Sequence, residues 1–128
     1  MRSDHADPIV LRELSYQVMA AAFEVHKLLG SGFLEKVYEN AFSRELAIRK
    51  ILAECQKEIK VFYKGHEIGS YITDLVIEGQ ILVELKAVDK LIPLHEAQLL
   101  NYLKATGIKL GLLINFGAER VEYKRLVF

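Results

Sequence analysis

Two acidic residues and one lysine have the types and spacing needed to act on a phosphate ester. Asp74 is followed ten positions later by Glu84, and Lys86 comes two residues after Glu84. Carboxylate oxygens are the ligands that Mg²⁺ prefers, and a nearby lysine can neutralise charge that develops on a phosphate. These residues in this order predict a divalent-metal site for phosphate chemistry.

The local sequence predicts a hairpin that brings these residues together. Residues 70–77 and 81–87 have the composition of strands, and residues 78–80 form a three-residue loop between them. In that register Asp74 lies opposite Glu84, and Lys86 shares their face because side chains alternate along a strand. Two opposed carboxylates repel each other, and a bound cation relieves that repulsion. The sequence Glu84-x-Lys86 alone is typical of a solvated face, but its Val, Leu and Ile neighbours indicate a strand buried on both sides.

A third acid could join this site from a preceding helix. Glu35 is expected in the first turn of that helix, with Tyr38 and Glu39 on the same side at spacings of three and four. On residue type alone, a capping Glu35 and a core Tyr38 are the better interpretation.

A polar stripe on the last helix faces one direction. His95, Gln98 and Tyr102 recur at spacings of three and four. Gln98 could hydrogen-bond the Lys86 or carboxylate cluster, or a DNA phosphate, although a lone glutamine is more often a boundary residue. His26, on the first helix, is better interpreted as a packed histidine than as a metal ligand.

The elements that must position these side chains follow from hydrophobic periodicity. The predicted order is ααβββαββ, an α/β fold with a mixed central sheet flanked by helices. The run 81–87 is mostly apolar, which favours a central strand. The predicted helices cover 9–29, about 34–52 and 95–106, and the strands cover 58–63, 70–77, 81–87, 110–114 and 121–128.

Composition restricts the class of protein. The 128 residues suffice for one domain, expected over 9–128 after a flexible N-terminal tail at 1–8. One cysteine, Cys55, excludes an internal disulfide framework and fits a reducing compartment. No apolar run is long enough for a membrane span, and we expect a cytoplasmic protein. Seventeen basic and 17 acidic residues exclude a polycation that coats nucleic acid by charge alone.

The motifs together resemble the GxxExxY protein family, which is placed in the PD-(D/E)xK nuclease superfamily with a restriction-endonuclease-like fold. The resemblance covers nearly the whole chain from about residue 10. It is carried by Gly32-x-x-Glu35-x-x-Tyr38, Asp74-x9-Glu84-x-Lys86, His95-x-x-Gln98-x-x-x-Tyr102-Leu103 and residues 111–117, Gly-Leu-Leu-Ile-Asn-Phe-Gly.

The resemblance implies a catalytic role for particular residues. Asp74 and Glu84 match the acidic metal ligands of the motif, and the Leu85 carbonyl would supply another oxygen. Lys86 matches the motif lysine, and Glu35 matches an acid that several superfamily members supply from an early helix. The implied ion is Mg²⁺, with Mn²⁺ as a substitute.

Other positions complete the implied site. Gln98 matches a glutamine often found on the helix after the Glu-x-Lys strand, and Tyr38 and Tyr102 would support the site. Thr73 stands where the motif proline would be, and that proline is often absent in the superfamily.

The function implied is metal-dependent hydrolysis of DNA phosphodiester bonds. One alternative is a nuclease fold that binds nucleic acid or joins a complex without cutting. Another is a purely structural role in which Asp74 and Glu84 point to solvent. The superfamily also suggests a homodimer, because cutting two strands requires two sites.

Overall fold

A five-stranded mixed sheet forms the centre of the molecule. The computed structural model describes residues 8–128. The strands lie in the order β1-β2-β3-β4-β5; β3 and β4 are parallel and the other neighbours antiparallel. The order ααβββαββ and the central position of β3 are therefore confirmed. The elements are α1 Pro8–Leu29, α2 Glu35–Ile48, β1 Ala53–Tyr63, β2 His66–Ile77, β3 Ile81–Lys86, α3 Pro93–Thr106, β4 Leu110–Asn115 and β5 Glu122–Val127.

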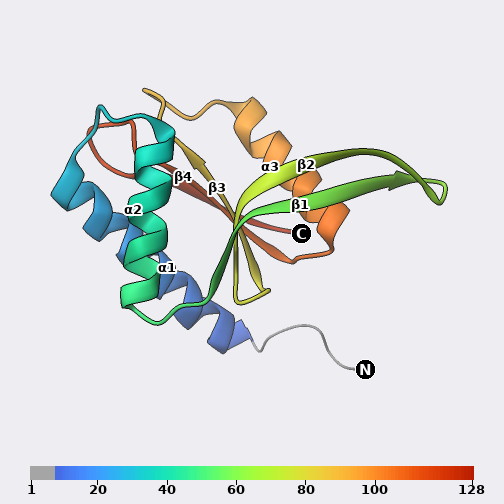
Figure 1. The fold of residues 1–128 in the computed structure, drawn as a ribbon, viewed down its shortest axis with the longest axis horizontal. Helices are drawn as coiled ribbons and strands as arrows, with labels where there is room; N and C mark the ends of the chain where they lie inside the picture. The colour runs from blue at the N-terminus through green and yellow to red at the C-terminus, as the bar shows by residue number, and fades with distance from the viewer. Residues whose placement is uncertain (1–7) are drawn as a thin grey trace.

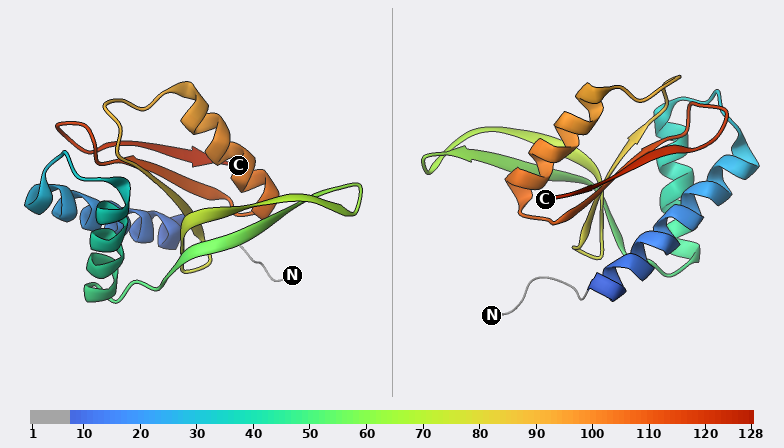
Figure 2. Two further views of the ribbon diagram at one scale, coloured as in Figure 1. Left: turned by 45° about the horizontal axis from the view of Figure 1, so that its top comes forward. Right: turned by 180° about the vertical axis from the view of Figure 1, so that it is seen from behind.

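Helices cover both faces of this sheet (Figures 1 and 2). On one face α1 and α2 pack on alternate residues of the central strands, among them Leu75, Val83 and Leu85. On the other face α3 packs on the intervening residues, including Val76 and Leu82. The central strands are thus buried on both sides, as their apolar sequence predicts.

The C-terminal ends of α1 and α2 differ in how well the sequence predicts them. The first helix ends before Gly30, which adopts a left-handed φ of 71°, as expected. The second was predicted to reach about residue 52, and this is wrong, because it ends at Ile48. There Lys50 takes a left-handed φ of 61° and the Ile51 N–H donates to the Leu46 carbonyl, which closes the helix.

The antiparallel pair β1–β2 extends beyond the rest of the molecule as an arm (Figure 1). Strand β2 begins at His66, four residues earlier than expected, because the turn at Lys64-Gly65 lets the pairing continue to the tip. Phe62, Tyr63 and Ile68 are each at least 60% exposed there. The arm has no core of its own, so its base beside β3 is where β2 becomes buried.

Two expectations concern the chain ends and membranes. The predicted tail, residues 1–8, lies outside the described residues except for Pro8, which begins α1. Within residues 8–128, none of the helices has both the length and the hydropathy needed to cross a membrane.

Candidate active site

The β2–β3 ladder ends at the candidate carboxylates. Ile77 pairs with Ile81 and Leu75 with Val83, in the predicted register, and the pairing stops there. Asp74, the next residue, lies at a gap in both ladders of β2, and on the β1 side the gap coincides with Gln56, which takes a left-handed φ of 54°. Its carboxylate instead accepts a hydrogen bond from the Leu85 N–H, with Oδ2 at 2.7 Å. The strands therefore separate where the two acids lie.

Glu84 reaches the same gap from β3. Its Oε1 accepts a hydrogen bond from the Thr73 hydroxyl at 2.8 Å, and the Asp74 N–H lies 3.4 Å away. Burial, and then the charge of Asp74, raise the pKa of Glu84 to about 7. The predicted repulsion between these two carboxylates is therefore present, although each has a hydrogen-bond donor.

Asp74 is the central group of the cluster. Burial raises its pKa first, the Leu85 N–H lowers it, and then Glu39 raises it and Lys86 lowers it. Lys86 also lowers the pKa of Glu84, yet it forms no direct ion pair with any carboxylate of residues 8–128. The lysine therefore acts on the acids at a distance and leaves them incompletely neutralised.

The first turn of α2 brings Glu35 to this cluster. Burial, followed by the charge of Asp74, raises the pKa of Glu35, and Lys86 lowers it. Tyr38 fixes this turn: its hydroxyl donates to the Gly30 carbonyl at 2.5 Å, and its ring stacks on Phe116 at 4.9 Å between centroids. Tyr38 is fully buried, and its hydroxyl bonds Gly30 and Phe33, so it supports Glu35 through the loop before α2.

A fourth carboxylate, Glu39, was not among the predicted site residues. It is only 5% exposed, and it accepts a hydrogen bond from Gln56 Nε2 at 2.6 Å and an ion pair from Lys36 at 3.5 Å. Its charge raises the pKa of both Asp74 and Glu35. The signal in the sequence was its position one helical turn after Glu35.

An aromatic pair borders the cluster on the α3 side. Tyr102 stacks on Tyr71 of β2 with ring centroids 3.8 Å apart. Burial, and then the charge of Glu84, raise the pKa of both hydroxyls. Tyr102 is therefore near the acids as expected, while Gln98 lies half-buried on α3 and forms no side-chain hydrogen bond with the described residues. Tyr71 had no counterpart in the sequence prediction.

Two of the histidines, His26 and His95, have structural partners. His26 donates a hydrogen bond from Nε2 to the Ala118 carbonyl at 3.0 Å, which confirms the expectation of a packed histidine. His95 accepts the Ile92 N–H at Nδ1, at 3.2 Å, and so caps the start of α3. Neither lies in a group of metal ligands.

The donor set fits a hard divalent ion that keeps water ligands. No group of three His, Cys, Asp or Glu side chains within residues 8–128 is placed to hold a metal by itself. The second oxygens, Asp74 Oδ1 and Glu84 Oε2, accept no hydrogen bond from the described residues. Mg²⁺ commonly binds through one or two carboxylates plus water and substrate phosphate, so these oxygens suffice.

Comparison with known proteins identifies the family. A family model described as the PD-(D/E)XK nuclease superfamily matches residues 12–126. The chain belongs to this superfamily. The narrower GxxExxY resemblance stays a prediction. The chain is similar to a solved structure, the crystal structure of SSO0001, with a TM-score of 0.48 and 18% identity over 88% of this chain and 76% of that one. No curated protein matches it.

A second polar cluster in this PD-(D/E)XK domain lies beside the first. Asn115, next to Lys86 in the β3–β4 register, is fully buried. Its side chain bonds Val88 N–H at 2.9 Å and Val88 carbonyl at 2.8 Å, and also the Gly117 N–H and Glu122. A Cβ on Gly117 would lie 2.4 Å from the Val88 carbonyl oxygen. These contacts hold the segment after Lys86 in place.

Proposed function

We propose that this chain is a metal-dependent nuclease that hydrolyses DNA phosphodiester bonds at the cluster of Asp74, Glu84 and Lys86. The observation that carries the proposal is the buried pair of repelling carboxylates at the gap between β2 and β3. Burial and the Asp74 charge raise the pKa of Glu84 to about 7. Membership of the nuclease superfamily also supports a nuclease function. Such a pair favours a cation, because a cation removes the repulsion.

Each side chain would have a distinct part. Asp74 and Glu84 would hold Mg²⁺ or Mn²⁺, with the Leu85 carbonyl as a further ligand. The ion, when bound, lowers the pKa of a water molecule and stabilises charge on the phosphate. Lys86 would hold its positive charge beside the phosphate or the attacking water.

The remaining residues would position these groups. Glu35, in the first turn of α2, would bind the ion directly or through one of its water ligands, and Tyr38 would fix that turn. Gln98 and Tyr102 would border the substrate from α3. If both strands of a duplex are cut, a homodimer would supply the second site.

A second candidate is a domain of nuclease fold that binds nucleic acid or a complex without cutting. One observation favours it: the net charge is zero, so the chain gains little affinity for DNA from its overall charge. The carboxylates and the lysine would then be retained without activity.

The test is cleavage of labelled duplex, branched and single-stranded DNA, with RNA in parallel, at millimolar Mg²⁺ or Mn²⁺. We expect cleavage that chelator abolishes, and a loss of about a thousandfold in Asp74→Asn and Glu84→Gln, because metal-assisted charge stabilisation is worth several kcal/mol. Glu67→Gln is the control, since Glu67 is an exposed acid on the same strand.

The outcomes separate the two candidates. Cleavage that is equal in wild type and Asp74→Asn would reflect a contaminant and overturn the proposal. Binding of DNA without cleavage of any substrate would favour the second candidate, and cleavage of RNA alone would correct the substrate.

A further inference from the structure

A cleft between α1 and the β4–β5 edge of the sheet is separate from the carboxylates. Its volume is about 730 Å³, and it shares no lining residue with the proposed active site. Lys109 and Val127 line one end, beside the start of β4. Because β3 and β4 are parallel, Glu84 and Lys86, near the end of β3, lie toward the opposite end of these strands.

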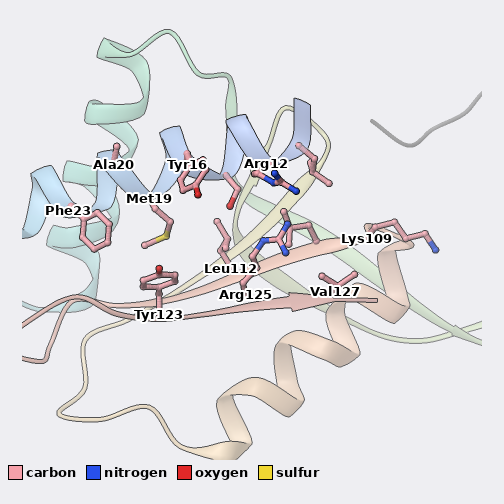
Figure 3. Close-up of a pocket in the computed structure, with 13 residues that line it drawn as sticks. Arg12, Tyr16, Met19, Ala20, Phe23, Lys109, Leu112, Tyr123, Arg125 and Val127 are labelled. Atoms are coloured by element: carbon pink, nitrogen blue, oxygen red, sulfur yellow. The ribbon is translucent and has the colours of Figure 1, made fainter. Parts of the chain in front are cut away.

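The cleft is apolar along its walls and floor. Met19 and Phe23 of α1 face Leu112 and Tyr123 of the sheet, and Phe23 meets Tyr123 edge to face with ring centroids 6.1 Å apart (Figure 3). Phe23 and Tyr123 are each 46% exposed. Both rings therefore keep nearly half of their surface exposed to water. Exposed apolar surface in a cleft is typical of a protein interaction site.

The charges lining the cleft have one sign. Arg12 of α1 and Arg125 of β5 extend into it from opposite walls, with Lys109 at one end (Figure 3). Among residues 11–128, no acid lines the cleft, and none of the three cations forms an ion pair with a carboxylate of this part of the chain. Two facing guanidinium groups repel each other, and a carboxylate placed between them would relieve this and accept bidentate hydrogen bonds.

The cleft opens at a free edge of the sheet. Strand β5 is last in the strand order and pairs only with β4 within residues 8–128. An extended peptide can pair with such an edge through its backbone while its side chains enter a neighbouring cleft. Residues Tyr123, Arg125 and Val127 of this edge strand all line the cleft.

We propose that this cleft binds an extended, acidic segment of a partner protein, which adds to the edge of β5. Its apolar side chains would cover the exposed rings of Phe23 and Tyr123, and its carboxylates would lie between Arg12 and Arg125. An apolar centre with arginine and aromatic residues is typical of protein interfaces, whereas nucleic-acid interfaces are more polar and more positive. The proposal does not depend on nuclease activity.

The test begins with a phage-displayed library of random 12-residue peptides selected on the full chain. We expect enrichment of peptides in which acidic residues alternate with apolar ones. A synthetic peptide from this set should lose about tenfold or more in affinity for Arg12→Glu and Arg125→Glu, measured by fluorescence anisotropy. Lys124→Glu is the matched control, because Lys124 is the neighbour of Arg125 on β5 and does not line the cleft.

A charge-reversed peptide completes the test. Replacing its acids with lysine should abolish binding to the wild type and restore binding to Arg125→Glu. The proposal is overturned if no peptide is enriched, if the enriched peptides lack acids, or if both arginine variants bind as the wild type does. It is equally overturned if Arg125→Glu abolishes only binding of a single-stranded oligonucleotide, or only self-association in sedimentation.

Discussion

Two buried polar clusters lie at the ends of the neighbouring parallel strands β3 and β4, and they differ in how well they are satisfied. At the end of β4, Asn115 has hydrogen-bond partners on both its amide nitrogen and its oxygen. The Leu91 N–H and Asn115 lower the pKa of Glu122. At the end of β3, burial and the Asp74 charge raise the pKa of Glu84 instead.

The difference shows that the hydrogen-bond and charge partners of a buried polar group, more than its position in the sheet, decide whether it stabilises the fold. Lys86 and Asn115 are direct neighbours in the β3–β4 register, so both clusters occupy similar places. A buried polar group whose hydrogen bonds are complete stabilises the fold, whereas buried charges of one sign oppose it. The Asn115 cluster is thus structural, and the carboxylate cluster has the properties expected of a binding site for a cation.

The largest expected effect is on the Asn115 cluster. Asn115→Ala should lower the free energy of unfolding by roughly 3 kcal/mol, because it removes a fully buried side chain and leaves the part-buried N–H groups of Val88 and Gly117 without partners. This corresponds to a fall of about 12 °C in melting temperature for a domain of this size. Thermal unfolding followed by circular dichroism measures it.

Asn101→Ala is the control for this variant, because Asn101 is exposed on α3. It should unfold within about 0.5 kcal/mol of the wild type. Equal stability of the two variants would show that the hydrogen bonds of Asn115 do not stabilise the fold.

The carboxylate cluster should respond in the opposite direction. Glu84→Gln should raise the free energy of unfolding of the metal-free protein by roughly 1–2 kcal/mol at pH 8, because it removes a buried charge and keeps an acceptor for Thr73. Urea unfolding at pH 8 measures this gain. Glu67→Gln, at an exposed position of β2, should leave stability unchanged.

The pH dependence gives a sharper form of the same prediction. The pKa of Glu84 is about 7 in the folded protein and lower in the unfolded chain, so the folded state holds the proton more tightly. The contribution of Glu84 to stability is therefore complete below about pH 4.5 and is lost as pH rises through about 7. Glu122 behaves oppositely, since its lowered pKa gives stability that is lost on acidification. Titration of the Glu84 carboxyl carbon by NMR with a midpoint near 4 would contradict this.

A smaller effect is expected at Tyr38. Tyr38→Phe keeps the ring on Phe116 but removes the hydrogen bond to the Gly30 carbonyl, at a cost of about 1 kcal/mol. Tyr63→Phe, on the exposed arm, is the control. The titration of Glu84 should be unchanged, because the groups that shift its pKa are Asp74, Thr73 and Lys86 rather than Tyr38. A shift in that titration would mean that the Tyr38 hydrogen bond influences the carboxylate cluster.

Much of the fold follows from the sequence because its determinants are local. The three-residue loop between Ile77 and Ile81 sets the hairpin register, and Gly30 and Gly107 end their helices as expected. The end of α2 could not be predicted, since Lys50 adopts a left-handed conformation without the glycine that usually marks it.

The site was predicted only where one hairpin contains it. Asp74 and Glu84 meet as expected because their register is local. Glu39 was missed as a site residue because its partner Gln56 lies 17 positions later on another element. The stack of Tyr71 on Tyr102 depends on how α3 packs against β2, which the sequence pattern does not specify.

We expect the carboxylates of Asp74 on β2 and Glu84 on β3 to form a divalent-cation site. Isothermal titration with Mg²⁺ and Mn²⁺, in the wild type and in the double variant Asp74→Ala/Glu84→Ala, tests it most directly. A non-cleavable DNA is present in one series, because substrate phosphates could complete the site. We predict binding to the wild type that vanishes in the double variant. Equal binding by the two proteins, or none by either with DNA present, would contradict the claim.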